Sequence, residues 1–599
     1  MTILQSLASY YDRMAARGEA EPPGFSREKI SFAVVIDRDG EPVAVSDLRD
    51  TTGKKPVATL RDVPASFKRP GVGVSPFFLW DTSAYVLGVD SKGDPRTAVK
   101  LAAFRDRHVG LLASTEDEGL LALRTFLERW VTERFAEAPF TADMLDTNIV
   151  FRLDGDVDDK GNPRLIHERP AASPLIEALL GSGEDGLCLI TGTVGPMARL
   201  HPTTKGVYSD SPPPGGGHSL VSFNARAFES WGREQGANAP TGEAAAARYG
   251  AALNRLLDRG SRNRMRIGDA TVAFWADTDG IEEAIAQAAE AALADIFGTG
   301  PKVDPDQDLS EARKVREALA IVAAGRPTTL NDVAIIPGTI VHVLGLSPNV
   351  ARLSVRFWLT KTLGHLAANL IKHEQDCRVE PLPWKAPPSI NWLLTNSVAA
   401  RQDGKNIPPL LAGEVARAVL AGTPYPRTLL TNAIMRLRAG DDPATGWHAA
   451  VVRAVLTRSY GGAPMGLSTT EENAGYRLGR LFAVLEEAQE RALGRVNASI
   501  RDRYFGAASA TPASVFPLLL RGVQNHLGKL RKDEPGSAQS VEIKLGEIMS
   551  GIATDLPKTL KLEDQGRFAI GYYHQRSERF RKKGEAAADA AGNEGTQDQ

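Results

Sequence analysis

Residues 30–45, with the sequence ISFAVVIDRDGEPVAV, decide the fold of the N-terminal part of the chain. The first seven residues form an apolar, β-branched run, and Val43, Ala44 and Val45 resume it after a polar turn. Runs of this composition favour strands. The turn contains Gly40, which can adopt the positive φ that a tight hairpin turn requires. The stretch therefore predicts a β-hairpin and places a sheet near the start of the chain.

Around this hairpin, short strands and amphipathic helices alternate over two successive segments. Residues 1–165 are expected to form an N-terminal α/β lobe, and residues 166–348 a second α/β lobe. Such alternation is typical of a sheet covered by helices. The further strands expected in the two lobes are 85–89, 187–191, 220–223, 270–275 and 335–346. The helices expected there are 3–14, 120–135, 244–257 and 280–297.

The pattern changes near Asn349, where strand-like runs give way to helical periods. Residues 349–464 are expected to form a helical lobe, residues 465–581 a C-terminal helical bundle, and residues 582–599 a disordered polar tail. The expected helices are 350–373, 410–421, 428–437, 445–459, 476–495, 512–530 and 540–554. The predicted fold class is α+β, with mixed α/β N-terminal lobes followed by an all-α C-terminal helical-bundle region.

The composition narrows the class of protein. The chain has 599 residues, with 71 Lys and Arg against 73 Asp and Glu, and a formal net charge of −2. About 150 residues per domain would give roughly four domains. Cys188 and Cys377 are the two cysteines, which excludes Cys-based zinc sites and disulfide frameworks. With neither a signal peptide nor an apolar run of about 18 residues, the sequence indicates a cytoplasmic protein without a membrane span.

The near-zero net charge excludes a chain that is basic throughout, but it conceals an uneven distribution. Residues 351–535 contain 24 Lys and Arg against 15 Asp and Glu, a net charge of +9, and the rest of the chain carries −11. Arginine predominates, and guanidinium groups bind phosphates in a bidentate way. The excess favours a surface that faces a polyanion. The alternative is an ordinary solvated helix surface with ion pairs such as Glu487 with Arg491.

Motifs of common enzymes are absent from the sequence. It contains no G-x-x-x-x-G-K-[ST] phosphate loop, no G-x-S-x-G nucleophile elbow and no H-E-x-x-H zinc motif. His365 and His373 are eight residues apart, too far to be two ligands of one metal on adjacent helical turns. The sequence therefore disfavours catalysis, and no cofactor or metal is expected. The alternative is a metal-dependent nuclease or hydrolase with an unrecognised active site, around His201 and His218 or between His365 and Asp376.

Residues 67–81 form the first stretch that is typical of a binding site. Two basic residues precede a loop with two glycines, and aromatic residues follow. Glycines allow a backbone to approach a ligand closely, and an aromatic side chain can stack on a base. The alternative is a strand that enters the core with its aromatic side chains packed inside. The candidate residues are Lys68, Arg69, Gly71, Gly73 and Phe77.

Residues 192–238 form the second candidate stretch. Polar and basic residues stand at the ends of its expected strands, where loops on a rigid scaffold concentrate binding residues. The Gly-Pro-rich run within it is more typical of a plain surface loop. The candidate residues are Arg199, Lys205, Ser222, Asn224, Gln235 and Asn238.

Several long phrases give the sequence a family resemblance. They are PFFLWDTSAYVLG (76–88), ARLHPTTKGV (198–207), LVSFN (220–224), AFES (227–230), LGLSPNVARLSVRFW (344–358), YFGAASATP (504–512) and IGYYHQR (570–576). In these phrases the sequence resembles the large subunit of Cascade, the type I-C CRISPR surveillance complex. The resemblance extends over nearly the whole chain.

The resemblance implies a non-catalytic subunit of an RNA-guided ribonucleoprotein complex in antiviral defence. Such a subunit recognises the flanking motif (PAM) in double-stranded DNA, assists R-loop opening and recruits a separate helicase-nuclease. Guide pairing then supplies the sequence specificity. The implied partners are guide CRISPR RNA, double-stranded target DNA and the other Cascade backbone subunits, with no membrane. A purely structural scaffold is a weaker alternative.

The two candidate stretches fit this implied role. Residues Lys68 to Phe77 are expected near the flanking duplex, and the 192–238 set near DNA or the 5′ end of the guide RNA. The C-terminal bundle resembles the Cascade small subunit, which in this family can be translated from an internal start, for which Met465 is the candidate here. The residues of the bundle expected to contact the DNA backbone are Arg477, Arg480, Arg495, Arg501 and Arg503.

Overall fold

The computed structural model describes residues 1–21, 24–53, 55–65, 73–179, 184–209, 217–223, 225–278, 280–297, 317–330, 333–408, 410–494, 496–553 and 555–580. The chain divides into two compact units. The N-terminal unit comprises Met1–Ser261 and Pro348–Ser354, and the C-terminal unit comprises Arg262–Ser347 and Val355–Gln599. The finer division into lobes at residues 165, 348 and 464 stays a prediction.

The hairpin predicted from residues 30–45 is confirmed. Strand β2 (Phe32–Ile36) pairs antiparallel with β3 (Pro42–Asp47), and Gly40 in the turn has a φ of 79°. A Cβ atom at Gly40 would lie 2.6 Å from the backbone nitrogen of Phe126, so the turn lies directly against a helix. Glycine is required here both for the backbone conformation and for the close approach.

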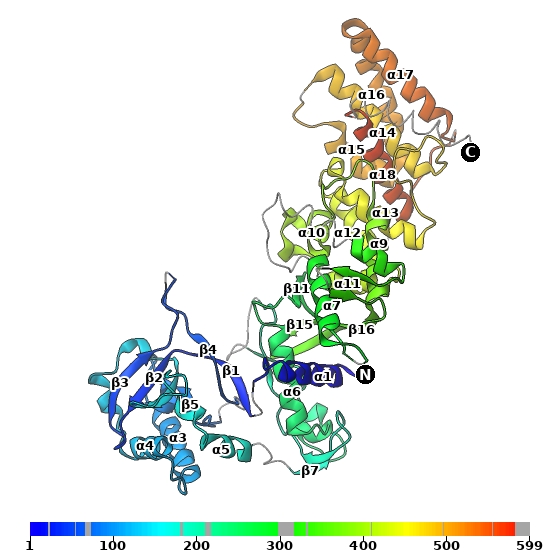
Figure 1. Cartoon of the computed structure of the whole chain (residues 1–599). Coiled ribbons are helices and arrows are strands. Elements are labelled where there is room, and N and C mark those ends of the chain that lie inside the picture. Colours follow the sequence, from blue (N-terminus) through cyan, green and yellow to red (C-terminus); the bar gives the residue numbers. More distant parts are fainter. Residues whose placement is uncertain are drawn as a thin grey trace. The chain divides into compact units, whose positions relative to one another are not determined.

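The hairpin is half of a four-stranded sheet with the order β3-β2-β6-β5 (Figure 1). Strand β6 (Asn148–Leu153) pairs parallel with β2, and β5 (Trp80–Thr82) pairs antiparallel with β6. Helices α3 (Thr97–Leu111) and α4 (Glu118–Arg129) bury apolar side chains against those of the sheet. The apolar side chains of the hairpin thus contribute to the first hydrophobic core of the chain.

The strand expected at residues 85–89 is wrong. The chain forms helix α2 (Ser83–Val86) there, and Gly88, with a φ of 73°, follows the helix. All four residues of α2 are buried. A short run that is buried on every side shows no period, so the sequence alone does not separate a helix from a strand.

The N-terminal unit contains further pairs of elements. Helix α1 (Ile3–Ala16) packs on α6 (Glu243–Leu256), which confirms both expected helices. Strands β1 (Phe25–Ile30) and β4 (Thr59–Pro64) form a separate two-stranded sheet. Helix α5 (Ala172–Leu179) adds to the core of the four-stranded sheet.

The strands around the second candidate stretch are very short. Strand β7 (Asp185–Leu187) pairs with β8 (Val194–Pro196), and β9 (Thr203–Thr204) pairs with β10 (His218–Ser219). The strand expected at 220–223 is therefore wrong, because the chain leaves the sheet at Ser219. Arg199 and Lys205 lie on the loops between these strands, and Ser222 follows β10. Gln235 and Asn238 are the first and last residues of a short 3-10 helix, η5 (Gln235–Asn238).

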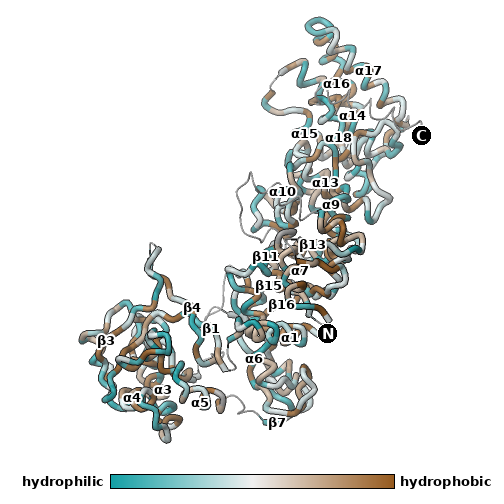
Figure 2. Tube along the Cα trace, in the orientation of Figure 1, coloured by the Kyte–Doolittle hydropathy of each residue, from teal (hydrophilic) through white to brown (hydrophobic). Residues whose placement is uncertain are grey.

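A second sheet lies at the start of the C-terminal unit, with the strand order β11-β12-β15-β16. Its strands are β11 (Arg264–Ile267), β12 (Ala270–Ala276), β15 (Ile340–Asn349) and β16 (Arg352–Thr362). Helix α7 (Glu283–Ile296) packs on the sheet, and Figure 2 shows hydrophobic segments gathered around it.

The helix expected over residues 350–373 is wrong in its first half. Residues 352–362 form strand β16, and helix α9 (Leu363–Cys377) begins only afterwards. The sequence RLSVRF at 352–357 alternates polar and apolar residues, which is the period of a strand. That signal was outweighed by the helical period of the residues that follow.

Helices make up the rest of the C-terminal unit (Figure 1), which confirms the predicted fold class beyond β16. They are α10 (Ile390–Ser397), α11 (Leu411–Ala421), α12 (Arg427–Arg438), α13 (Trp447–Ser459), α14 (Ala474–Leu493), α15 (Ile500–Ala510), α16 (Pro512–Asp533), α17 (Pro535–Ser550) and α18 (Leu562–Glu578). Within the described residues, no helix is both long and apolar enough to cross a membrane.

Helices α14 and α18 form the most extensive helix pair. A Cβ atom at Gly479 would collide with the carbonyl oxygen of Phe568, and one at Gly571 would collide with that of Tyr476. Glycines on both helices therefore let their backbones approach closely. Tyr476, Ile570 and other residues of this pair also belong to the core formed with α9, α11 and α13, so one core extends across the boundary expected at 464.

Candidate nucleic-acid interface

Two residues of the second candidate stretch meet in the fold. Arg199 donates its Nε–H to Oε1 of Gln235 at 2.7 Å, although 36 residues separate them. Gly236 makes this possible, because a Cβ atom there would collide with the carbonyl oxygen of Ala198. The backbone N–H of Gly236 also donates to the carbonyl of Arg199 at 3.2 Å. The exposed guanidinium of Arg199 is thus held in a defined orientation.

Asn238, a third residue of that set, fixes the loop rather than facing outward. Its Oδ1 accepts the N–H of Ser230 at 3.0 Å, and its Nδ2 donates to the carbonyls of Arg233 and Gln235 at 2.9 and 3.0 Å. One side chain therefore closes residues 230–238 into a braced loop. The half-buried amide of Asn238 therefore stabilises the loop. Any contact of the loop with a ligand would come from its other residues.

The remaining residues of the second set are more dispersed. Lys205 places Nζ 2.5 Å from Oε2 of Glu28, so its charge is balanced within the N-terminal unit. Its backbone N–H donates to Oδ1 of Asn254 at 2.7 Å. Ser222 is half-buried, and Asn224 lies outside the described residues. Within this set Arg199 is exposed, Gln235 is half-buried beside it, and the role of the set stays a prediction.

Sequence reasoning missed an aromatic residue on the same loop. Trp231 is 94 % exposed and has a φ of 57°, which is unusual for a residue other than glycine. Phe228 is also exposed, and the guanidinium of Arg352 lies 4.3 Å from its ring centroid. The sequence signal was the tryptophan directly before Gly232, between arginines at 226 and 233.

The first candidate stretch is described only in part. Lys68, Arg69 and Gly71 lie outside the described residues. Gly73 is exposed. Phe77 stacks on Trp80 at 4.6 Å between ring centroids and packs at the edge of a small core. Phe77 is half-buried, and its role at a ligand stays a prediction.

Three arginines predicted to contact the DNA backbone make contacts inside the C-terminal unit. Arg480 is 6 % exposed and donates to Oε1 of Gln575 and to the carbonyl of Ser468, at 2.9 and 3.0 Å. Arg477 donates to the carbonyls of Glu471 and Gly551. Arg501 pairs with Asp442 at 2.9 Å. These side chains connect helices, and Arg495 lies outside the described residues.

Other arginines of residues 351–535 also make contacts inside the C-terminal unit. Arg458, beside Asp376 at 2.6 Å, is buried and also donates to two backbone carbonyls. Arg356 pairs with Asp269 at 2.8 Å. These two arginines therefore stabilise the fold, although the charge count over residues 351–535 includes both.

Arg503 differs from these residues, because it is exposed. It lines a hollow of about 260 Å³ together with Tyr504, Gln489 and His526. The neighbouring helix α16 carries a basic stripe that sequence reasoning did not single out. On its helical period, the exposed residues Arg521, Asn525, Lys529 and Lys532 share one face. We call these four residues the α16 stripe.

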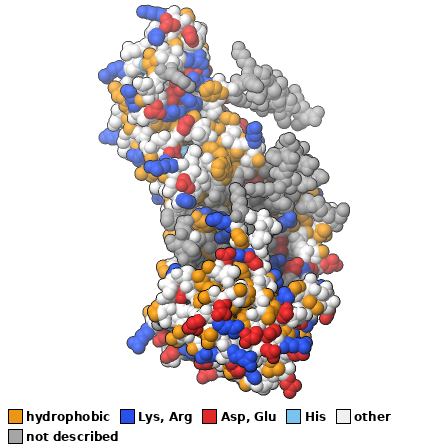
Figure 3. Space-filling model, turned by 90° about the vertical axis from the view of Figure 1, so that its left-hand side faces the viewer, with side chains coloured by type: hydrophobic (Ala, Val, Ile, Leu, Met, Phe, Trp, Pro, Cys, Tyr) orange, Lys and Arg blue, Asp and Glu red, His pale blue; other side chains and the backbone are white. Residues whose placement is uncertain are grey.

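The visible surface carries both signs of charge. Figure 3 shows Lys and Arg side chains spread over the C-terminal helices, with Asp and Glu side chains between them. Arg531, beside the stripe, pairs with Glu542 at 2.6 Å. No ion pair within the described residues involves Arg521, Lys529 or Lys532. The cations of the α16 stripe are thus exposed and keep their charge for a ligand.

The histidines considered as an alternative active site take part in internal contacts. His373 bonds the hydroxyl of Tyr425 at 2.7 Å, and its Nδ1 lies 3.6 Å from Sγ of Cys377. Burial lowers the pKa of His373 to about 3 and raises that of the Cys377 thiol. His365 bonds Thr362 at the N-cap of α9.

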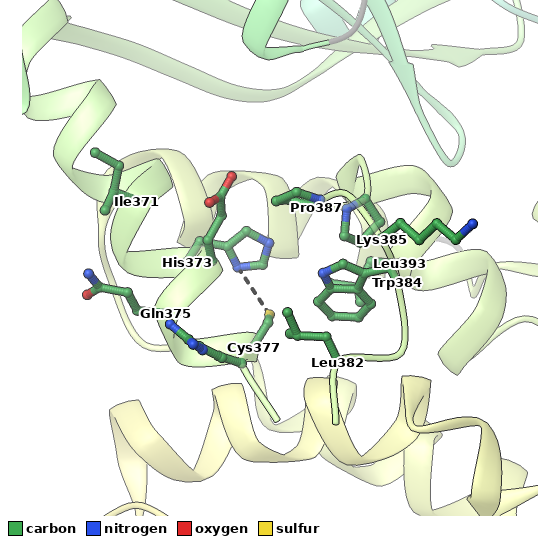
Figure 4. Close-up of a pocket in the computed structure, with 12 residues that line it drawn as sticks. Ile371, His373, Gln375, Cys377, Leu382, Trp384, Lys385, Pro387 and Leu393 are labelled. Atoms are coloured by element: carbon green, nitrogen blue, oxygen red, sulfur yellow. Dashed lines mark hydrogen bonds between the residues drawn. The ribbon is translucent and has the colours of Figure 1, made fainter. Parts of the chain in front are cut away.

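Two of these residues, His373 and Cys377, line a hollow of about 410 Å³ (Figure 4). His373 and Cys377 lie on one side of it, and Leu382 and Trp384 lie on another. Lys385 extends from the same segment as Trp384. The lining combines apolar side chains with two cations, Arg378 and Lys385, and a single acid, Glu374.

The other pair considered for catalysis, His201 and His218, is also buried. His201 bonds the hydroxyl of Tyr249 at 2.6 Å, and burial lowers its pKa to about 4. Among the residues that the structure describes, no group of three His, Cys, Asp or Glu side chains is placed to hold a metal ion.

Comparison with known proteins places the chain in a family. The search of curated proteins found no match. Residues 7–580 match the family described as CRISPR-associated protein (Cas_Csd1), which is nearly the whole chain. The exposed Arg199–Gln235 pair and the α16 stripe are compatible with a partner that carries phosphates. On the extent of the match, the chain belongs to the Cas_Csd1 family of CRISPR-associated proteins.

Proposed function

We propose that this protein is the non-catalytic large subunit of an RNA-guided CRISPR type I-C interference complex, Cascade. In that role it recognises the PAM in double-stranded DNA, assists R-loop opening and recruits the helicase-nuclease. Membership of the Cas_Csd1 family supports a Cascade large subunit, and the finer role rests on the surfaces described above. The protein would act in the cytoplasm, with guide CRISPR RNA and the other Cascade subunits as partners.

The observation that carries the proposal is the contact between Arg199 and Gln235. A guanidinium whose Nε is already bound to a neutral amide keeps its positive charge and its outer N–H groups for a ligand. Arginine in such an arrangement binds phosphate or the O6 and N7 atoms of guanine. The neutral partner distinguishes Arg199 from Arg501 and Arg458, whose partners are carboxylates.

Two further regions belong to the proposal. Lys68, Arg69, Gly71 and Gly73 stand in a glycine-containing basic stretch and are proposed to lie near the flanking duplex. In the C-terminal helices, backbone contacts are proposed for Arg503 and the α16 stripe, because Arg477, Arg480 and Arg501 are engaged within the fold.

The test is target binding by the reconstituted complex that contains this chain. We expect Arg199→Ala to weaken binding of duplex DNA bearing the correct flanking motif by about tenfold, in the range of one bidentate contact. Arg417→Ala, which removes an exposed arginine of α11, is the matched control and is expected to bind as the wild type does.

Two outcomes would overturn the proposal. One is equal binding of DNA with and without the flanking motif, together with no effect of Lys68→Ala and Arg69→Ala, which would favour a structural scaffold. The other is cleavage of DNA by the purified chain in the presence of a divalent metal ion, which would favour a nuclease.

A further inference from the structure

Trp231 is placed at the tip of a tight two-residue turn. Trp231 and Gly232 have φ values of 57° and 70°, and the N–H of Arg233 donates to the carbonyl of Ser230 at 2.9 Å. Positive φ at both central residues is the conformation of a type I′ turn, in which Asn and Gly are the usual residues. A tryptophan in this position is strained, and such strain is concentrated at functional sites.

The turn is rigid at its base. Asn238 makes three hydrogen bonds, to Ser230, Arg233 and Gln235, at 2.9–3.0 Å. Gly236 lies against the backbone of Ala198. The indole of Trp231 is nevertheless 94 % exposed. A large aromatic ring is thus fixed in solvent, where it gains nothing for the stability of the fold.

The surroundings of the turn favour an anionic partner. Arg226 and Arg233 are exposed on the same loop, and Arg199 is bound to Gln235 at the base of the turn. Arg352 stacks on Phe228, three residues before Trp231. Glu229 and Glu234 are the acids of the loop, so arginines outnumber acids around the tryptophan. An aromatic ring among guanidinium groups is the composition that binds unpaired nucleotides.

We propose that Trp231 stacks on an unpaired nucleobase, while Arg199 and Arg233 contact the flanking phosphates. This inference rests on the proposed function and deepens it, because it assigns a single-stranded ligand to a surface beside the Arg199–Gln235 pair. The ring face recognises any base, so the base can belong to a DNA strand or to the guide RNA.

The experiment measures binding of fluorescent oligonucleotides to the full-length chain by anisotropy. The ligands are oligothymidine and oligouridine, each of about 20 nucleotides, and a duplex of the same length. Trp231→Ala is expected to weaken single-strand binding by about 5- to 150-fold, the range for loss of one stacked base. The affinity for the duplex is expected to change by less than about twofold, because phosphate contacts dominate duplex binding.

Two variants serve as controls. Trp231→Phe keeps an aromatic face and is expected to retain most of the affinity. Trp392→Ala removes another exposed tryptophan, 55 % accessible on α10, and is expected to bind as the wild type does. The oligonucleotide whose binding depends more strongly on Trp231 identifies the base as belonging to DNA or to RNA.

The outcomes separate this inference from the proposed function. Single-strand binding that is unchanged by Trp231→Ala overturns the inference and leaves the function standing. If the wild-type chain binds the duplex but neither single strand, the inference is likewise overturned and the proposed function is left standing. Binding of no nucleic acid, with loss of Cascade subunit assembly in Trp231→Ala, overturns the inference in favour of a protein contact and counts against the function as well.

Discussion

The Nε–H of Arg199 donates to Oε1 of Gln235 at 2.7 Å, across a close approach that Gly236 permits. This contact joins two segments that the sequence keeps 36 residues apart. It matters because it orients a guanidinium without neutralising it. The hydrogen bond to Gln235 is therefore expected to strengthen ligand binding by holding Arg199 in position.

A double-mutant cycle tests this positioning. Gln235→Leu removes the acceptor, and we expect binding of motif-bearing DNA to the complex to weaken by about fivefold, which is close to 1 kcal/mol. Arg199→Ala, Gln235→Leu together should be no worse than Arg199→Ala alone, because Gln235 acts only through Arg199. Additive losses in the two variants would show that Gln235 contacts DNA itself.

The fold could be predicted where local patterns and tertiary structure agree. The hairpin at residues 30–45 was found because its turn and its strands both point to one structure. Strand β16 was missed because the helical period of α9 directly follows it. The second candidate stretch was found from its polar residues, but the meeting of Arg199 and Gln235 depends on Gly236, whose role is visible only in three dimensions.

The net charge of residues 351–535 does not show which of their arginines reach the surface. A count over residues 351–535 treats every arginine alike, whereas burial separates them. Arg480 is buried between helices, and Arg503, only 23 positions later, is exposed. Burial also decides the role of Trp231. A tryptophan is more often packed than exposed, so the sequence alone does not indicate that this one is exposed.

Arg480 and Arg503 are expected to respond oppositely to substitution. Arg480→Ala removes the hydrogen bonds to Gln575 and Ser468, and should lower the free energy of unfolding by about 2–3 kcal/mol. DNA affinity of the folded protein should then be unchanged. Arg503→Ala should leave unfolding within about 0.5 kcal/mol and weaken DNA binding. Denaturant titration and anisotropy on both variants check this, and the reverse pattern would contradict the assignment.

The α16 stripe predicts a salt effect. If the proposed surfaces make about six phosphate contacts, affinity should fall by roughly 10³-fold between about 50 and 200 mM salt. Changing Arg521, Lys529 and Lys532 to Glu should reduce the slope of log affinity against log salt by about three. The matched control changes the exposed residues Lys405, Arg417 and Arg427 to Glu. An equal loss of slope in the control would mean that the effect arises from net charge and not from the stripe.

His574 predicts how stability depends on pH. It is a buried residue of α18 whose Nδ1 lies 3.0 Å from the hydroxyl of Tyr476 on α14, and burial lowers its pKa from 6.5 to about 4. The unfolded chain therefore binds a proton between these pH values that the folded chain does not. Stability from this group is present above pH 6.5 and is lost as the pH falls towards 4, by an amount on the order of 3 kcal/mol.

Unfolding measured at several pH values tests the sign. Between pH 6.5 and 4, the slope of the unfolding free energy against pH should be smaller in His574→Gln. The decrease should correspond to at most one proton. His365→Gln, at an exposed position, is the control and should leave the profile unchanged. The buried His108 and His373, whose pKa values are also lowered, keep part of the acid sensitivity in both variants. An unaltered profile in His574→Gln would contradict a neutral, buried imidazole.

The last prediction concerns Met465, proposed as an internal translation start. Met465 is partly exposed in the loop before α14, and α14–α18 have a core of their own that includes Phe482, Phe516 and Phe568. A polypeptide of residues 465–599 should therefore retain this core, while Tyr476 and Tyr573 lose their contacts with the α9–α13 core.

We expect cells expressing the gene to contain this short product beside the full chain. Met465→Leu should abolish the short product on a gel, while Met435→Leu, at another exposed methionine, should leave it in place. Leucine has nearly the volume of methionine, so the full chain should fold in both variants. A short product that persists undiminished in Met465→Leu, or that begins at a different residue on N-terminal sequencing, would refute the start. A short product that depends on Met465 would mean that helices α14–α18 occur both within this chain and as a separate protein.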